Sequence, residues 1–173
     1  RLLGFNEPDF EKQSNLSVDQ VISYWPILEK VDLPLASPSV GHATRPWMVE
    51  FMQKTEESCL RMEYIAVPWY GGPNAAGFKN KMREAYTLYG SWRPMLITEF
   101  AVADWDATTL EENRHSPAEV LAFMKDVLPW MEEPEQDWIA GYSWFSFDAS
   151  AAVGTSSALF DDDSGVTALG RYY

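Results

Sequence analysis

Short apolar runs alternate along this chain with longer segments of helical periodicity, and this alternation constrains the fold more than any other feature. The runs occupy residues 2–5, 33–36, 64–67, 95–97 and 139–147. Strands that alternate with helices are typical of parallel βα units, either in a closed barrel or in an open doubly wound sheet. No glycine-rich nucleotide-binding motif follows any of the runs, so the pattern favours the barrel.

Helix start signals lie between the apolar runs. Ser17 and Gln20 have capping-box spacing, and apolar residues at helical spacing follow them, although Pro26 should kink that helix or end it early. Three further helices are predicted, one from Pro46, one over 75–89 with Gly90 as a left-handed cap, and one from Ser116.

The composition predicts a packed globular chain whose ligand is uncharged. Hydrophobic residues make up 46% of the sequence, and 26 acidic against 13 basic residues give a net charge of −13. An acidic chain is a poor partner for nucleic acid or for an anionic membrane surface, and no apolar run is long enough to span a membrane. Cys59 is the single cysteine and the two histidines are far apart, so we expect neither a disulfide nor a metal site, and no cofactor.

Two glutamates follow apolar runs at the positions where parallel α/β folds collect their catalytic groups. The first run leads into Asn6 and Glu7, and the fourth leads into Glu99. A carboxylate next to a buried strand loses solvation, which is unfavourable unless a partner or a function requires it. Cleavage of a glycosidic bond uses such a pair, one carboxylic acid as proton donor and one carboxylate as nucleophile or base. A structural role remains the alternative for each residue alone.

Aromatic residues lie at or just after the ends of the same runs. They are Trp69, Tyr70, Trp105 and Trp144. Flat rings can stack on the apolar faces of sugar rings, whereas core packing is the alternative for any single tryptophan. Tyr70 and Trp144 are the preferred candidates because each lies at the mouth end of a predicted strand.

Six segments in order resemble one known family, the alkali-sensitive-linkage type glycosyl hydrolase catalytic domain, which is family 128 of the glycoside hydrolases in clan A. They are LLGFNEPD from Leu2, LPLASPSV from Leu33, YIAVPWYG from Tyr64, MLITEFA from Met95, GYSWFSF from Gly141 and ALFDDDSGVTALGRYY from Ala158. The resemblance implies a (β/α)8 TIM barrel, action on β-1,3-glucan with retention of configuration, and a location outside the cell or in the cell wall.

The resemblance also implies roles for individual residues. Glu7 would be the acid/base, Glu99 the nucleophile, and Asn6 a ligand of the sugar 2-hydroxyl, with Trp69, Tyr70 and Trp144 binding substrate. The five runs would be strands four to eight, so residues 1–173 would form one partial barrel domain whose first three βα units lie upstream. Pro68 departs from the pattern, because the family usually has a histidine before the Trp-Tyr pair.

Two other interpretations remain open. A degenerate barrel could bind glucan without cleaving it, which the departure at Pro68 would favour. An α/β enzyme acting on a phosphorylated metabolite is disfavoured, because the chain lacks a phosphate loop and basic residues at its strand ends. The sequence does not predict an oligomeric state.

Overall fold

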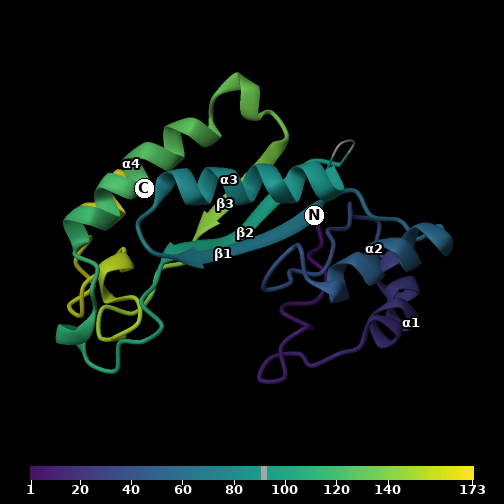
Figure 1. The fold of residues 1–173 in the computed structure, drawn as a ribbon, viewed down its shortest axis with the longest axis horizontal. Helices are drawn as coiled ribbons and strands as arrows, with labels where there is room; N and C mark the ends of the chain where they lie inside the picture. Colours follow the sequence, from purple (N-terminus) through teal and green to yellow (C-terminus); the bar gives the residue numbers. More distant parts are fainter. Residues whose placement is uncertain (91–92) are drawn as a thin grey trace. The chain divides into compact units, whose positions relative to one another are not determined.

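A computed structural model of the protein describes residues 1–90 and 93–173. Its sheet has three parallel strands in the order β1-β2-β3 (Figure 1). The strands are β1 (Ile65–Gly71), β2 (Met95–Val102) and β3 (Ile139–Trp144). α3 (Ala75–Ala85) lies in the chain between β1 and β2, and α4 (Pro117–Met131) lies between β2 and β3. The predicted alternation of strand and helix is present in this part of the chain.

The prediction of a (β/α)8 TIM barrel with five βα units is wrong. The first two predicted strands form only isolated parallel bridges, Leu2 with Leu35, Asn6 with Ser39 and Ala36 with Tyr64. Pro34 and Pro38 lie in the second of these segments, and proline has no N–H to donate to a hydrogen-bond ladder. The described residues therefore form a three-stranded α/β sheet with helices.

The first two helices begin where the sequence predicts. α1 (Val18–Glu29) has the capping box, since the Gln20 N–H donates to the Ser17 hydroxyl and the Gln20 side chain accepts from the Ser17 N–H. The helix does not end at Pro26 but continues to Glu29. α2 (Pro46–Glu57) has proline at its first position, where no intrahelical donor is needed.

Gly90 does not form the predicted left-handed cap. α3 continues into a π-helical turn, Tyr86–Gly90, and no described glycine has a positive φ. A Cβ at Gly90 would lie 2.2 Å from the Tyr86 ring, and that ring stacks on Trp138 at 4.6 Å between centroids. Gly90 is therefore required by a close side-chain contact and not by its backbone angles.

α4 shows the second capping box, in which the Glu119 N–H donates to the Ser116 hydroxyl and the Glu119 carboxylate accepts from the Ser116 N–H. The apolar residues at helical spacing along α4 are all buried, namely Val120, Phe123, Met124, Val127 and Met131. The shorter elements are the 3-10 turns Leu110–Glu112, Pro134–Gln136 and Thr155–Ser157, and α5 (Ala168–Tyr172). No helix within residues 1–90 or 93–173 is long and apolar enough to cross a bilayer.

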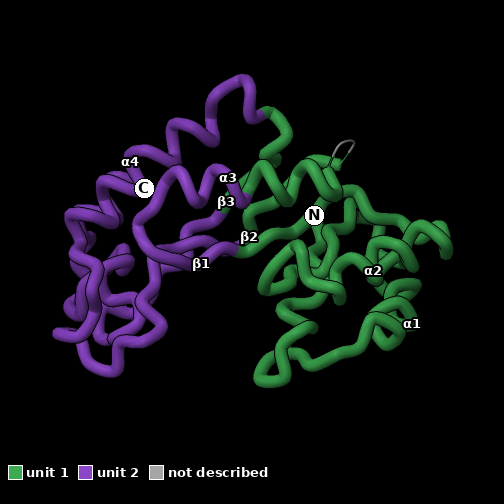
Figure 2. Tube along the Cα trace, in the orientation of Figure 1, with its two compact units in different colours: residues 1–68, 82–98, 137–142 green, residues 69–81, 99–136, 143–173 purple. Residues whose placement is uncertain are grey.

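The chain divides into two compact units (Figure 2). Unit 1 comprises residues 1–68, 82–98 and 137–142, and unit 2 comprises 69–81, 99–136 and 143–173. Each strand begins in unit 1 and ends in unit 2.

The core of unit 1 lies where α1 packs on α2. Trp25 and Phe51 are fully buried, with ring centroids 5.2 Å apart, and Trp47 stacks on Phe51 at 5.6 Å. The two indole N–H groups donate to backbone carbonyls, Trp25 to Arg61 and Trp47 to Leu16, each over 2.9 Å. Both polar groups are therefore satisfied within the apolar core.

The core of unit 2 is aromatic. Phe78 of α3 is fully buried against Phe100 of β2 and Phe123 of α4, with centroid distances of 5.5 and 5.8 Å. Phe78 and Phe123 meet edge-on, which is a favoured geometry for aromatic pairs, and the ring of Phe100 is tilted by 35° against Phe78. These rings hold α3 and α4 against the ends of the strands that lie in unit 2.

Candidate active site

Glu99, the predicted nucleophile, is held by Tyr70. Glu99 is half-buried in β2, and the Tyr70 hydroxyl donates a hydrogen bond to its Oε2 over 2.6 Å. That distance lies at the short end of the usual range for an O–H donor, so the contact fixes the carboxylate firmly. β2 continues beyond Glu99 to Val102, so Glu99 lies within the strand and not at its end as predicted.

The alternation of side chains along β1 separates Trp69 from Tyr70. The Trp69 ring stacks on Phe123 of α4 at 5.3 Å and meets Phe78 of α3 edge-on at 5.2 Å. Successive side chains of a strand point to opposite faces of the sheet. Tyr70 therefore points away from the face that α3 and α4 cover.

The same alternation of side chains places Glu99 on the face of the sheet to which Tyr70 points. Phe100, the next residue in β2, is fully buried against Phe78, so it points toward the helices and Glu99 points away from them. The hydrogen bond from Tyr70 joins two side chains of one face. The sheet thus presents a carboxylate and its donor on the side opposite α3 and α4.

Two predicted substrate-binding residues, Trp144 and Trp69, pack against the side chains of the helix-covered face, where Trp144 is buried and Trp69 is half-buried. The Trp144 side chain is 5% exposed, its Nε1 donates to the Ser157 carbonyl over 2.9 Å, and its ring meets Phe100 edge-on at 5.1 Å. A ring enclosed in this way has no free face for a sugar. Both side chains point to the helix-covered face of their strands, and sugar stacking on Trp144 or Trp69 stays a prediction.

Asn6 and Glu7, the other predicted site residues, lie in unit 1. Asn6 is exposed and forms a parallel bridge with Ser39, and the Glu7 N–H donates to the Ser39 carbonyl over 2.7 Å. Glu7 is half-buried and has φ of 40°, in the left-handed region that few non-glycine residues adopt. Such backbone strain persists only where the surroundings impose it, and it is frequent at functional sites.

Asp9 and Ser39 anchor the segment around Glu7. The Asp9 carboxylate accepts from the Gly41 N–H over 3.2 Å and pairs with Arg45 over 3.0 Å. The Ser39 hydroxyl is hydrogen-bonded to the Thr98 hydroxyl at 3.0 Å, while its carbonyl accepts from Glu7. The backbone of Glu7 and the residue that precedes Glu99 are therefore both bonded to Ser39 within unit 1.

Phe145 and Phe147, which were not among the predicted site residues, lie next to Tyr70. Their rings lie around Tyr70, with centroids 5.6 and 6.0 Å from its own, and Trp105 lies 5.6 Å away on the loop after β2. Their spacing in the sequence could have pointed to them. In an extended chain, Phe145 and Phe147 are two positions apart and therefore lie on one face, opposite to that of Trp144.

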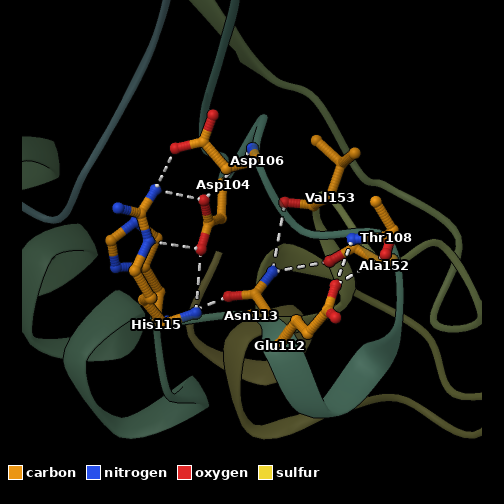
Figure 3. Close-up of polar contacts among 9 residues, drawn as sticks. Asp104, Asp106, Thr108, Glu112, Asn113, His115, Ala152 and Val153 are labelled. Carbon is orange, nitrogen blue, oxygen red and sulfur yellow. Dashed lines mark hydrogen bonds and ion pairs between the residues drawn. The ribbon is translucent and has the colours of Figure 1, made fainter.

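Asp104 is the most strongly perturbed carboxylate near these rings. It is buried, and three donors of Arg114, the backbone N–H, Nε and Nη2, bind its two carboxylate oxygens (Figure 3). The hydrogen bonds from the Arg114 side chain are the main reason that the pKa of Asp104 lies well below its usual range. The same interactions raise the pKa of Arg114. Asp104 is therefore a fixed anion that forms a structural link and is not a proton donor.

A hollow of about 500 Å³ lies elsewhere in unit 2. It is lined by the start of α3, from Ala75, and by Glu119, Phe123 and Asp126 of α4. Asp126 is already paired with Lys79 over 2.7 Å. The described residues contain no cluster of three or more His, Cys, Asp or Glu side chains with the geometry of a metal site.

Comparison with known proteins identifies the family. Residues 1–173, the whole chain, match the family model described as glycosyl hydrolase catalytic core. No curated protein matches the chain.

Solved structures share the fold. A family 128 (subgroup I) endo-β-1,3-glucanase from Amycolatopsis mediterranei, in complex with laminaripentaose, is 26% identical with a TM-score of 0.84, over 98% of this chain and 69% of that one. A subgroup V exo-β-1,3-glucanase from Cryptococcus neoformans is 28% identical with a TM-score of 0.81, over 99% and 67%. A subgroup IV endo-β-1,3-glucanase from Lentinula edodes, at 19% identity and a TM-score of 0.76 over 98% and 67%, shows the fold alone.

The resemblance to family 128 is thus confirmed, and a catalytic family is favoured over a degenerate binding module. The match over the full chain shows that this protein belongs to the glycosyl hydrolase catalytic core family and is a glycoside hydrolase.

Proposed function

We propose that this protein hydrolyses β-1,3-glucan with retention of configuration, with Glu99 as nucleophile and Glu7 as acid/base. The observation that carries the proposal is the Tyr70 hydrogen bond to Glu99, on the sheet face that α3 and α4 leave uncovered. The similar enzymes from Amycolatopsis mediterranei and Cryptococcus neoformans are named as β-1,3-glucanases, which supports the substrate class. A polymeric substrate of this kind favours action outside the cell or at the cell wall.

The proposed mechanism is a double displacement. The Glu99 carboxylate attacks the anomeric carbon, the glycosidic C–O bond breaks, and Glu7 protonates the departing oxygen. Glu7 then takes a proton from water, whose oxygen attacks the same carbon and releases Glu99. Retention requires the two carboxyl groups to approach to about 5 to 5.5 Å when substrate is bound.

Two further side chains would assist the two glutamates. Tyr70 donates to Glu99 and would hold its second oxygen in line with the anomeric carbon. Asn6 is exposed next to Glu7 and carries an amide that can donate to the sugar 2-hydroxyl, where a hydrogen bond strengthens in the transition state.

Hydrolysis of laminarin and laminaripentaose tests the proposal. We expect the wild-type protein to release shorter laminari-oligosaccharides, and proton NMR of the first products to show the β-anomer. Glu99→Gln and Glu7→Gln should each lower kcat by at least about a thousandfold, because each removes a group that acts on the reacting atoms. Glu135→Gln is the matched control, since Glu135 is an exposed glutamate of the 3-10 turn before β3 and should retain activity.

Azide separates the two roles. In Glu99→Gly, azide can occupy the vacated space and attack the anomeric carbon in place of the carboxylate. The product is then an α-glycosyl azide, because a single displacement inverts the configuration of that carbon. In Glu7→Gly, azide can instead release the glycosyl-enzyme as a β-glycosyl azide. Full glucanase activity in Glu99→Gln would refute the assignment, and initial release of the α-anomer by the wild type would replace retention with inversion.

A further inference from the structure

Ser39 uses each of its polar groups on a residue close in sequence to one of the two proposed catalytic glutamates. Its N–H donates to the Phe5 carbonyl over 2.9 Å, and its carbonyl accepts from the Glu7 N–H over 2.7 Å. Its hydroxyl is hydrogen-bonded to the Thr98 hydroxyl at 3.0 Å, and Thr98 directly precedes Glu99 in β2. Ser39 is 7% exposed, so these hydrogen bonds are largely shielded from competing water.

The main chain of Ser39 holds the backbone that leads into Glu7. Its two hydrogen bonds form the parallel bridge between Asn6 and Ser39. A Cβ at Gly4 would lie 3.0 Å from the carbonyl oxygen of Ala36, so the two segments run in close contact. Glu7 itself has φ of 40°, a backbone conformation that persists only where its neighbours impose it. The backbone at Glu7 therefore takes its position from Ser39.

Ser39 is in turn fixed by the residues before it. The Ser37 N–H donates to the Tyr64 carbonyl over 2.9 Å, and the Ser37 hydroxyl accepts from the Ala66 N–H of β1 over 2.9 Å. Pro38 lies between Ser37 and Ser39, and its ring locks one of the two backbone angles there. Ser39 is thus held in place by the sheet before its hydroxyl forms a hydrogen bond.

The pair of hydroxyl groups is not explained by stability alone. Alanine and valine have nearly the shapes of Ser39 and Thr98, and they would pack in the same space without polar groups to satisfy. Replacing both partners of a hydrogen bond by apolar groups of the same shape is often close to neutral for stability. What such a replacement removes is a directional link between the segment of Glu7 and the strand of Glu99.

We propose that Ser39 is a positioning residue for both proposed catalytic glutamates. Its main chain sets the backbone at Glu7, and its hydroxyl orients Thr98 and with it the start of the Glu99 side chain. The inference rests on the proposed β-1,3-glucanase function. A displacement of about 1 Å in a reacting group can lower the rate on the order of a hundredfold, so a residue that acts only through the glutamates affects kcat.

Ser39→Ala and Thr98→Val test the link, and Thr98→Ser is the conservative variant. Each of the first two should lower kcat for laminaripentaose by about tenfold and leave KM within about twofold, because a positioning link and no substrate contact is lost. Thr98→Ser keeps the hydroxyl and should keep most of the activity.

Thr55→Val is the matched control for Thr98→Val. Thr55 is a buried threonine of α2 in the same unit, and its hydroxyl donates to the Phe51 carbonyl over 2.8 Å. This variant also loses a buried hydroxyl and its hydrogen bond. It should lower the urea unfolding midpoint and leave kcat unchanged.

The double variant Ser39→Ala/Thr98→Val separates positioning from stability. Each single variant leaves one hydroxyl without its partner, whereas the double variant removes both, so its urea midpoint should return toward that of the wild type. Its kcat should stay about tenfold low and fall no further than in the single variants, because all three lack the same hydrogen bond. Near-ultraviolet circular dichroism establishes that each variant is folded.

The outcomes separate this inference from the proposed function. If the wild type cleaves laminarin and Ser39→Ala keeps wild-type kcat, Ser39 is not a positioning residue, while the glucanase proposal stands. A kcat that recovers in the double variant together with the midpoint would also overturn the inference, since the pair would then serve stability alone. If the wild type does not cleave laminari-oligosaccharides, the proposed function fails and the positioning role fails with it.

Discussion

At the scale of the residue, Tyr70 makes a different contact with each end of its side chain. Its hydroxyl donates to Glu99, and its ring packs against Trp105 and Phe145. A phenol suits this position because one end is apolar and the other can donate a hydrogen bond. Tyr70 thereby connects the Glu99 carboxylate to the neighbouring aromatic rings.

Tyr70→Phe separates these two contacts. The ring contacts should remain, so KM for laminaripentaose should change little. Loss of the donor to Glu99 should lower kcat by about ten- to hundredfold, because a group that orients the proposed nucleophile in the transition state is removed. Steady-state kinetics measure both values. A rise in KM at unchanged kcat would show that the hydroxyl serves binding and not the reaction.

At the scale of the element, the loop after β2 depends on an ion pair more than on regular structure. Residues 103–116 contain one 3-10 turn, Leu110–Glu112, and the Asp104 carboxylate binds Arg114 across that turn. The Asp104 side chain is 1% exposed, whereas that of Arg114 is 64% exposed. Loss of Arg114 would leave the buried Asp104 carboxylate without its partner, which is destabilising, whereas loss of the Asp104 carboxylate removes the hydrogen bonds that hold the loop.

The pH dependence of stability should report this ion pair. The pKa of Asp104 is lowered on folding, chiefly by the Arg114 hydrogen bonds. Its contribution is therefore fully present above the unfolded pKa of about 4 and is lost as the pH falls below that value. Asp104→Asn should lower the urea midpoint at pH 7, and the gap to wild type should narrow between about pH 4 and pH 2.

Asp106→Asn is the control for that comparison. Asp106 also accepts from Arg114, but its side chain is 84% exposed, so its loss should change the midpoint little at any pH. A gap between wild type and Asp104→Asn that stays constant down to pH 2 would show that Asp104 contributes by packing and not by its charge.

At the scale of the whole molecule, each unit depends on its own aromatic core. In unit 2, Phe78 has no exposed surface. Its ring lies against the rings of Trp69, Phe100, Phe123 and Trp130. The face of the sheet that carries Glu99 is therefore supported from behind by a rigid aromatic layer.

Phe78→Ala should destabilise the protein by about 3 to 5 kcal/mol, because it leaves a cavity between closely packed rings. That is a large share of the roughly 5 to 15 kcal/mol by which a typical protein is stable. Phe160→Ala, at the surface, should change the free energy of unfolding by no more than about 0.5 kcal/mol. Urea unfolding followed by tryptophan fluorescence measures both. Equal losses in the two variants would show that the aromatic layer of unit 2 is not the source of stability.

The sequence alone determined the local elements, because their signals lie within a few residues. The capping boxes at Ser17 and Ser116 satisfy backbone hydrogen bonds within four residues, so they do not depend on the rest of the chain. The family motifs likewise carried the resemblance that the full-length match confirms.

Only the tertiary structure decided which side chains face which side of the sheet and how far the sheet extends. Trp69 and Tyr70 are neighbours in the sequence, yet the first packs against Phe123 on the helix-covered face and the second binds Glu99 on the other face. Whether the segments at Leu2 and Leu35 are strands depended on partners remote in the chain, and prolines limit them to isolated bridges. Such choices depend on long-range contacts, because a strand has two faces and the residues packed against them are distant in sequence.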